Sequence, residues 1–498
     1  MNEKLKMENG KLKKYKLTEY IDSFGDGIHG TPDYDEKGAY YFVNGNNLKE
    51  GKINITEDTL KVSSNEYSKI KRNLIPNNTI LVSINGTLGN VALYRNENIA
   101  LGKSACYLNL KNSSFRFFLR YVLETKEFKN YMNRVAGQST IKNVSPTQIS
   151  EYEFFAPPLE SQQKIAAVLS ALDDKIALNR SINAKLEAMA KRLYDYWFVQ
   201  FDFPFDFACF DYACFDYACF DYACFDYAQQ PSDSRPNRNA CPPVAERSRG
   251  YKSSGGKMEY NATLKREIPA GWEVKSINDI STSARGVSYT ADDEKSNTDE
   301  NVVLILRGNN IANNHIVFDG NTVYVDSSFV SQEQRIKKFD IVITMSSGSK
   351  EHIGKSAMFL FDSEHSYGAF CNKITPAKDC QFFLENYLHS DFFTKYIRQS
   401  CSGTGINNLT NAHFDKALFA FPPDNILKLF NKRVDAIYSQ CGIIEQESLK
   451  LTALRDYLLP LLMNGQVSVD TDNVCEFCNA KLVKSAKADD MNGQVEVK

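Results

Sequence analysis

Two long stretches of the chain repeat apolar residues at alternating steps of three and four. The first follows Pro157 and Pro158, and its apolar positions are Ile165, Val168, Leu172, Ile182, Leu186, Met189 and Leu193. The second follows Pro422 and Pro423, and its apolar positions are Phe430, Val434, Ile437, Cys441, Ile444, Leu451 and Leu458. This spacing predicts two long helices, each with a single apolar seam.

The length of these helices favours a rod. A helix of about 38 residues measures roughly 57 Å, because each residue adds about 1.5 Å. Two such helices would bury their seams against each other as a coiled coil, and two ordinary core helices are the alternative. Lys175 and Asn179 interrupt the first seam, and Asn179 would fix the register of the pair.

The residues before each Pro-Pro pair follow a different pattern. Runs rich in Phe, Tyr, Val and Ile alternate with short polar turns over residues 1–156 and again over 258–421. Such runs are typical of β-strands. We therefore expect an α+β protein with two strand-rich domains in tandem, each followed by a long helix.

The two halves also repeat each other in sequence. FVNGNNLKEGKI (42–53) shares Gly-Asn-Asn and a following apolar residue with LRGNNIANNHI (306–316). PNNTILVSINGTLGNVALY (76–94) and KKFDIVITMSSGSKEHIGKSAMF (337–359) each contain an apolar strand, a polar turn, a glycine and a second strand.

The C-terminal ends of the two domains are also similar in sequence. The segment at 137–158, GQSTIKNVSPTQISEYEFFAPP, aligns with the segment at 402–423, SGTGINNLTNAHFDKALFAFPP. Asn143 and Gly89 both have counterparts 265 positions further along the chain. One plan of elements therefore occurs twice.

Charge alone does not indicate a nucleic-acid partner, because the net charge of the 498 residues is −2. Residues 1–156 are less balanced, with 22 Lys and Arg against 17 Asp and Glu. Such a surplus could meet phosphates, although an ordinary solvated surface explains it as well.

The cysteines do not have the spacing of a disulfide framework. Of the 12, five lie in or near one short repeat, at Cys209, Cys214, Cys219, Cys224 and Cys241. The N-terminal residues are charged, and no apolar run is long enough to span a membrane. We expect a reduced, cytoplasmic protein with no membrane partner.

The motifs that resemble catalytic or metal sites are incomplete. Gly-Lys-Ser at 354–356 ends as a phosphate-binding loop does, but Ser349 stands where that loop needs its first glycine, so a turn between strands is expected. SFGDGIHG (23–30) is expected to be a surface turn. Cys475 and Cys478 form a lone pair where zinc needs four ligands. We predict no catalytic residue and no metal site in this chain.

Two segments carry a family resemblance. They are GQSTIKNVSPTQISEYEFFAPPLESQQKIAAVLSALDDKIALNRSINAKLEAMAKRLYDYWFVQFDFP (137–204) and YKSSGGKMEYNATLKREIPAGWEVKSINDI (251–280). Both closely resemble the specificity (S) subunits of type I restriction–modification systems. The resemblance covers nearly the whole chain, apart from about 205–250 and the last thirty residues.

This resemblance implies a DNA-reading function. Each strand-rich domain would be a target-recognition domain that reads one half of a split site in double-stranded DNA. The helices would pack as an antiparallel coiled coil and set the unread gap, which gives a pseudo-twofold internal repeat. Two methyltransferase (M) subunits would supply S-adenosylmethionine and adenine N6 methylation, and restriction (R) subunits would supply ATP- and Mg²⁺-dependent cleavage. The S subunit itself would be non-catalytic and hold no cofactor.

The predicted domain bounds follow from these patterns. They are 1–156 for the first target-recognition domain, 157–200 for the first helix, 201–257 for a disordered linker, 258–421 for the second target-recognition domain, 422–466 for the second helix and 467–498 for a flexible tail.

Polar turns supply the candidate DNA contacts, because their side chains offer donors and acceptors to base edges and phosphates. In the first domain they are Asn85, Thr87, Asn90, Gln138, Ser139, Thr140, Lys142 and Asn143. In the second they are Arg307, Ser347, Ser349, Lys350, His352, Lys355, Thr404, Asn407 and Asn408. Asn and Ser also hydrogen-bond their own backbone in turns, so positions shared by both halves can simply hold the fold. Residues that differ between the halves are favoured as base readers over the shared Gly-Asn-Asn, namely Ser349, Lys350, His352 and Arg307.

Two other functions stay open at this stage. A coiled-coil scaffold would have the same domains and bind no DNA. A fragment of a fused DNA methyltransferase would need a catalytic domain, for which 498 residues leave no room once both halves are assigned.

Residues 205–250 interrupt the resemblance and contain CFDYA four times without a change, at 209–228. A short DNA unit duplicated within a tolerant loop would produce such a tract, and its Pro-, Arg- and Ser-rich end is typical of disorder. The alternatives are an element that tunes the tether of the second domain, a metal or redox role for the evenly spaced cysteines, and a self-associating aromatic segment.

Overall fold

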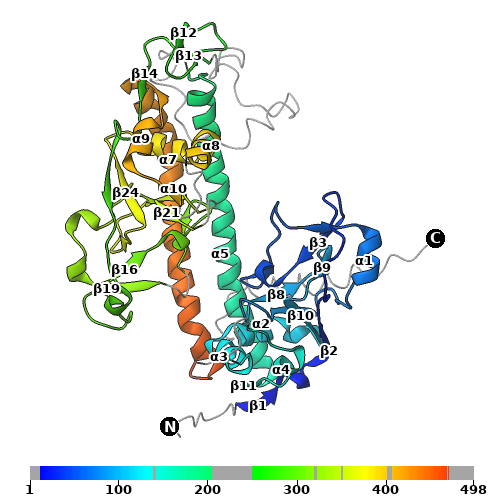
Figure 1. Cartoon of the computed structure of the whole chain (residues 1–498). Coiled ribbons are helices and arrows are strands. Elements are labelled where there is room, and N and C mark those ends of the chain that lie inside the picture. The colour runs from blue at the N-terminus through cyan, green and yellow to red at the C-terminus, as the bar shows by residue number, and fades with distance from the viewer. Residues whose placement is uncertain are drawn as a thin grey trace, which may run out of the picture. The chain divides into compact units, whose positions relative to one another are not determined.

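The computed structural model describes residues 12–137, 142–204, 250–318, 322–348, 352–400, 407–467 and 469 (Figure 1). The chain forms two compact units. Unit 1 consists of residues 1–179 and 447–498, and unit 2 consists of residues 180–446. Each unit contains one strand-rich domain and a part of each long helix.

The strand-rich domain of unit 1 contains two main sheets. Four strands form an antiparallel sheet in the order β2 (Ile21–Asp26), β10 (Ala105–Leu110), β7 (Thr79–Ser83) and β8 (Val91–Tyr94). Three strands form the second sheet, in the order β6 (Lys61–Val62), β3 (Tyr40–Val43) and β9 (Ile99–Leu101), with β3 and β9 parallel. Two further pairs are β1 (Lys13–Lys16) with β11 (Glu153–Ala156), and β4 (Leu48–Lys49) with β5 (Lys52–Ile53).

The central strands β7 and β8 are buried on both faces, which explains why their sequences are apolar throughout. Ile80 and Val82 pack into a core shared with the helices, whereas Leu81, between them, packs with the residues of the second sheet. The helices of this domain are α1 (Ser64–Ile70), α2 (Arg116–Glu124), α3 (Lys126–Val135) and α4 (Pro146–Ser150).

Unit 2 has the same topology. Its four-stranded antiparallel sheet has the order β15 (Ser281–Arg285), β24 (Cys371–Pro376), β20 (Ile341–Thr344) and β22 (Ser356–Met358). Its three-stranded sheet has the order β19 (Val323–Asp326), β16 (Val302–Leu306) and β23 (Ser366–Tyr367), again with one parallel pair, β16 and β23.

The remaining elements of unit 2 follow the same plan. The strand pairs are β14 (Glu273–Lys275) with β26 (Phe419–Phe421), β17 (Ile311–Ala312) with β18 (His315–Ile316), and β21 (Ser346–Ser347) with β25 (Asn407–Asn408). The helices are α7 (Gln381–Leu388), α8 (Asp391–Ser400) and α9 (Asn411–Lys416). A hairpin of β12 (Met258–Asn261) and β13 (Arg266–Pro269) precedes them. The predicted fold, two strand-rich domains built on one plan, is confirmed.

A long helix follows each domain, as predicted. Helix α5 (Leu159–Tyr194) has 36 residues and continues as a π-helical turn over Asp195–Val199. Helix α10 (Asp424–Met463) has 40 residues and contains Pro460. Both are therefore close to the length that the seams indicated.

The two helices pair antiparallel within each unit. In unit 1, Asp173 of α5 contacts Arg455 of α10, and Asn179, further along α5, contacts the earlier Glu447. In unit 2, Asn183 donates a hydrogen bond to the carbonyl of Cys441 at 3.2 Å, and the ring of Tyr194, further along α5, lies 6.4 Å from that of the earlier Phe430. Numbers rise along α5 as they fall along α10, which is the antiparallel arrangement.

The predicted seam of α5 is partly wrong. Met189 is 41% exposed, and Val168 is only half-buried, whereas Leu169 and Ala190 are fully buried. The buried face is displaced by one position because α5 packs against its neighbouring domain as well as against α10: Leu169 belongs to the core of unit 1 and Ala190 to that of unit 2.

The buried Asn179 has the environment expected of a register-fixing residue. Its amide donates to Glu447 Oε2 at 2.7 Å and to Ser448 Oγ at 3.2 Å. An apolar residue opposite would leave this amide unpaired, so these bonds favour one axial alignment of the helix pair.

The two ends of the segment 205–249 meet at one point. Pro204 and Gly250 form an antiparallel bridge, and the Tyr251 backbone donates to the Phe203 carbonyl at 2.8 Å. The rings of Phe203 and Tyr251 stack with their centroids 4.7 Å apart. Residues 201–204 and 250–257, which we predicted as part of a disordered linker, therefore meet in a defined contact, in which Phe201 and Phe203 are buried and most of 252–257 is exposed. The CFDYA tract lies outside the described residues, as do Cys475 and Cys478.

The structure also bears on two other expectations from the sequence. The segment 23–30, predicted as a surface turn, begins within strand β2, because Ser23–Asp26 pair with β10. Among the described residues, none of the helices is both long and apolar enough to cross a membrane.

Candidate nucleic-acid interface

In unit 1 a polar loop links β7 to β8, and one serine holds it closed. The Ser83 hydroxyl donates to the Thr87 carbonyl at 2.6 Å and accepts from the Asn90 backbone at 2.8 Å. Gly89 has φ +77°, a left-handed conformation that favours glycine, and its N–H donates to the Ser83 carbonyl at 3.0 Å. The bonds that fix this loop involve the backbone of Thr87 and Asn90, and the Thr87 side chain is exposed.

A second predicted segment lies beside this loop. Asn85 and Asn143 form an antiparallel bridge, and the Val144 N–H donates to the Ile84 carbonyl at 3.0 Å. The Lys142 ammonium donates to Asn133 Oδ1 of α3 at 2.8 Å. The structure thus brings together Asn85, Thr87, Asn90, Lys142 and Asn143. Gln138, Ser139 and Thr140 lie outside the described residues.

Unit 2 repeats this arrangement with a longer loop. The Gly354 N–H donates to the Thr344 carbonyl at 2.9 Å, as Gly89 donates to Ser83, and the Leu409 N–H donates to the Met345 carbonyl at 2.7 Å. Ten positions separate Thr344 from Gly354, against six between Ser83 and Gly89.

Within this longer loop, Ser346 and Ser347 form strand β21, which pairs with Asn407 and Asn408. The Lys355 ammonium lies 3.0 Å from His352 Nδ1, a contact in which the ammonium donates and the neutral imidazole accepts. The structure therefore places Ser347, His352, Lys355 and Asn408 on one loop pair. Ser349, Lys350 and Thr404 lie outside the described residues, as does the side chain of Asn407.

The Gly-Asn-Asn turns explain where Arg307 lies. A Cβ on Gly308 would come 2.9 Å from Thr344 Cγ2, and one on Gly45 would come 2.8 Å from Ser83 Cβ. Both turns therefore sit against the base of their loop, and Arg307, which precedes Gly308, borders it. The last asparagine of each turn is structural, since Asn310 is fully buried and accepts from the Arg307 N–H at 2.9 Å.

Sequence reasoning missed the basic side chains that helix α3 of unit 1 and helix α8 of unit 2 place beside the loops. In unit 1, a Cβ on Gly89 would come 3.6 Å from Lys129 Cγ of α3, so this side chain covers the end of the loop. In unit 2, Arg398 of α8 lines a cavity of about 240 Å³ together with Lys355 and Thr394. The two residues are not equivalent: a shift of 265 places Lys129 on Thr394 and Arg398 on Asn133, so the internal repeat gives no signal for either of them.

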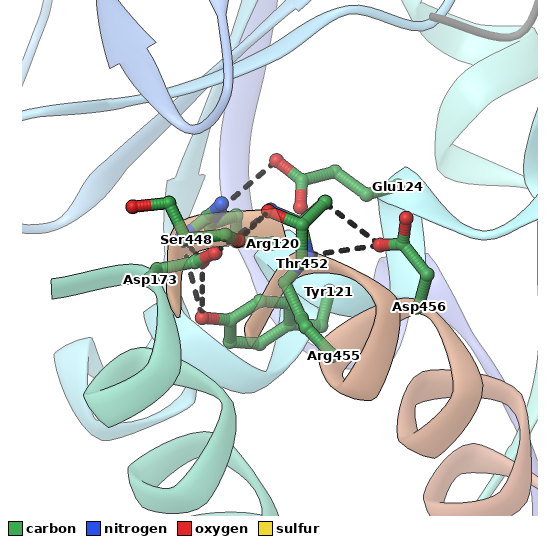
Figure 2. Close-up of polar contacts among 8 residues, drawn as sticks. All are labelled: Arg120, Tyr121, Glu124, Asp173, Ser448, Thr452, Arg455 and Asp456. Atoms are coloured by element: carbon green, nitrogen blue, oxygen red, sulfur yellow. Dashed lines mark hydrogen bonds and ion pairs between the residues drawn. The ribbon is translucent and has the colours of Figure 1, made fainter. Parts of the chain in front are cut away.

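A charged cluster joins the first domain to both helices within unit 1 (Figure 2). Arg120 of α2 pairs with Glu124 at 2.9 Å and with Asp173 of α5 at 2.8 Å, and Arg455 of α10 reaches the other oxygen of Asp173 at 3.0 Å. The Tyr121 hydroxyl donates to Asp173 at 2.7 Å. The Arg120 side chain is only 9% exposed, so these partners replace most of its water.

The pKa values of Asp173 and Arg120 show that the opposite charges in the cluster compensate for burial. Burial alone would raise the pKa of Asp173, but Arg120 and the hydrogen bonds from Tyr121 and Arg455 outweigh it and lower this pKa. Burial likewise opposes the charged form of Arg120, yet the charges of Glu124, Tyr121 and Asp173 raise its pKa. Both shifts favour the charged forms of Asp173 and Arg120, whereas burial outweighs Arg120 at Glu124 and raises the pKa of that carboxyl group.

The corresponding place in unit 2 holds titratable groups. Glu385 of α7 lies 265 positions after Arg120 and contacts His389 Nδ1 at 3.2 Å. His315 of β18 contacts Glu187 of α5 at 3.3 Å. Burial, and then the negative charge of Glu187, raise the pKa of Glu385 to about 8 despite the opposing effect of His315. Burial also raises the pKa of Glu445 to about 7.

Over the described ranges, no three His, Cys, Asp or Glu side chains lie together as metal ligands would. The polar loops are the features that the two units share at equivalent places. Their geometry suits binding through hydrogen bonds and charge.

Comparison with known proteins assigns the chain to a family. The model of the type I restriction modification DNA specificity domain matches residues 10–188 and 269–453, one match for each half of the chain. The chain belongs to this family. The two matches of the specificity domain agree with the internal repeat and leave the CFDYA segment uncovered.

Relatives with this domain are similar over different lengths. The type I restriction enzyme StySPI specificity subunit of Salmonella potsdam is 31% identical over 216 residues, 42% of this chain and 46% of that protein. The match therefore spans about half the length of that relative. The MjaIX specificity subunit of Methanocaldococcus jannaschii is 24% identical over 434 residues, 85% of this chain and 84% of that protein.

A solved structure is also similar. The crystal structure of the type I restriction-modification S subunit from M. genitalium matches 95% of this chain and 100% of its own, with 16% identity and a TM-score of 0.47.

Proposed function

We propose that this chain recognises a two-part site in double-stranded DNA and directs a type I restriction–modification complex to it. The observation that carries the proposal is the duplicated loop pair: residues 84–90 with 142–144 in unit 1, and residues 345–348 and 352–355 with 407–409 in unit 2. The backbone of the two pairs is held by equivalent hydrogen bonds, while most exposed side chains differ. Two loops with the same backbone hydrogen bonds but different exposed side chains are suited to the recognition of two different half-sites.

The partners follow from membership of the family. We propose that methyltransferase and restriction subunits assemble on this chain, two of the former, and carry S-adenosylmethionine, ATP and Mg²⁺. The chain itself would be non-catalytic. Its weak net charge fits such an assembly, because partner subunits would supply part of the phosphate neutralisation. A cytoplasmic location stays a prediction.

The proposal is tested by selecting DNA from a random double-stranded library with the chain bound to its methyltransferase subunits. We expect one motif with two defined halves separated by a fixed number of undefined base pairs. A mobility-shift assay at increasing salt should show a falling affinity for the selected DNA, because phosphate contacts weaken as the salt concentration rises.

The other functions give different results in this selection. A coiled-coil scaffold would enrich no motif. A fused methyltransferase fragment would methylate DNA without added subunits. The duplicated loops favour the DNA-reading function over both.

A further inference from the structure

Phe370 is an exposed aromatic residue at the edge of the unit 2 loop pair. Its side chain is 69% exposed, as much as that of Tyr260 and more than any other large apolar side chain among the described residues. A single exposed apolar residue is common on protein surfaces, so exposure alone assigns it no role. The position of Phe370 adds the further argument.

The Phe370 backbone is bound directly to the loop. Its carbonyl accepts hydrogen bonds from the Met345 N–H at 2.8 Å and from the Ser346 N–H at 3.2 Å. Ser346 is the first residue of β21, the strand that pairs with Asn407 and Asn408. Phe370 therefore lies at the base of the ribbon formed by β21 and β25, whose residues are serines and asparagines, and its ring is exposed.

The equivalent position in unit 1 is Ser104. Its carbonyl accepts from the Ile84 N–H at 2.9 Å, just as Phe370 accepts from Met345. The Ser104 hydroxyl is used inside the domain, because it accepts from the Gly45 N–H at 2.8 Å and donates to Asn44 Oδ1 at 2.9 Å. A phenyl ring can make neither bond, and Arg307 takes the place of Asn44. The two units thus differ at a position that their backbones share.

The chemistry of this edge fits one feature of DNA. The major groove admits a two-stranded β-ribbon, and the thymine 5-methyl group is the apolar feature among its hydrogen-bonding base edges. The ribbon of β21 and β25 with Phe370 at its base offers matching residue types, an exposed apolar ring at one end of a backbone ribbon of serines and asparagines. We propose that Phe370 is a specificity-determining residue that contacts the 5-methyl group of a thymine in the half-site read by unit 2. This inference rests on the proposed function and adds a base identity to it.

The test uses the chain bound to its methyltransferase subunits and the motif that this complex selects. Replacing each thymine of the motif by uracil removes only the methyl group. We expect one uracil, in the half-site of unit 2, to weaken binding of the wild-type complex about fourfold, the effect of losing one buried methyl-sized group. The variant F370A should bind thymine and uracil there with less than a twofold difference, and F370S, which introduces the unit 1 residue, should do the same.

Y260A is the matched control, because Tyr260 is equally exposed but lies on the β12–β13 hairpin. It should keep the thymine preference. The unit 2 half-site is the half that stays unchanged in a variant carrying both Asn85→Ala and Asn143→Ala.

Three results would overturn the inference: a unit 2 half-site without thymine, a wild-type complex that is indifferent to every uracil, or an equal loss for wild type and F370A. The uracil substitutions are also measured with the wild-type complex alone. A folding defect in F370A therefore leaves the test of the thymine methyl contact intact. Absence of any two-part motif would instead refute the proposed function, which separates the two failures.

Discussion

Arg120 shows how individual residues fix a recognition domain to its helices. Its guanidinium meets Glu124 and Asp173 where little water remains, and Arg455 completes the charge balance (Figure 2). Burying such ions is costly, so the cluster is stable only while every partner is present. Single substitutions within it should therefore have large effects.

We expect R120M to lower the free energy of unfolding of unit 1 by about 3–5 kcal/mol, because it removes an ion-pair partner from two largely buried carboxylates, Glu124 and Asp173. Y121F removes one hydrogen bond to Asp173 and should cost about 1.5 kcal/mol. Hydrogen exchange of the α2 amides in urea measures both. K69M is the control, since Lys69 pairs with Glu66 at the surface and its loss should not be measurable. An R120M effect as small as that of K69M would contradict this role.

Glu385 makes the stability of unit 2 depend on pH. In the folded unit its pKa is raised from 4.5 to about 8, so between these values the folded state binds more protons and stability falls as pH rises. His389 acts in the opposite sense below pH 6.5, because burial lowers its pKa to about 4. Above pH 6.5 the raised pKa values of Glu385, Glu445 and His315 all have the same consequence, which is that stability falls as the pH rises.

Between pH 6.5 and 8 we therefore expect unit 2 to lose about 1–2 kcal/mol of stability. Hydrogen exchange of the α7 amides at the two pH values measures the loss, and α2 of unit 1 is the internal reference. E385Q keeps the shape of the side chain and cannot ionise, so its stability should vary less. If wild type and E385Q had the same pH dependence, Glu385 would not be the titrating group.

At the scale of elements, the sequence predicted both long helices and the strand-rich domains, because these depend on local periodicity. The buried face of α5 was only partly predictable, since the periodicity cannot tell which neighbour covers which side. The Arg120 cluster could not be predicted either: its members lie on three elements far apart in sequence. The polar loops were found because the internal repeat aligns them, whereas Lys129 and Arg398 lie on helices and become neighbours of the loops only in the fold.

The closed base of the CFDYA segment leads to a prediction for that element. Because Pro204 and Gly250 already pair, joining them through two or three glycines in place of 205–249 should leave both units folded. The unfolding transition and the selected DNA motif of this deletion variant should match those of the full chain. A changed motif would mean that the segment tunes the tether of the second domain.

At the scale of the whole molecule, duplication is the feature on which the proposed function rests. Two units with one topology present two loop pairs whose backbones are fixed alike and whose side chains differ. A family resemblance predicted this division from sequence. The side chains that contact bases are not set by periodicity or by the repeat, because they depend on the position of each loop residue in space.

The most direct test of the two-reader claim compares the motifs selected by the wild-type chain and by one variant of each unit, all bound to methyltransferase subunits. The unit 1 variant carries Asn85→Ala and Asn143→Ala, and the unit 2 variant carries Lys355→Ala. Asn65→Ala and Asn297→Ala, at exposed positions outside the loops, are the controls. We expect a two-part motif from the wild type and the controls, and each loop variant should relax one half while the other half and the gap stay unchanged. A continuous motif, or a variant of one unit that changes both halves, would contradict the assignment of one half-site to each unit.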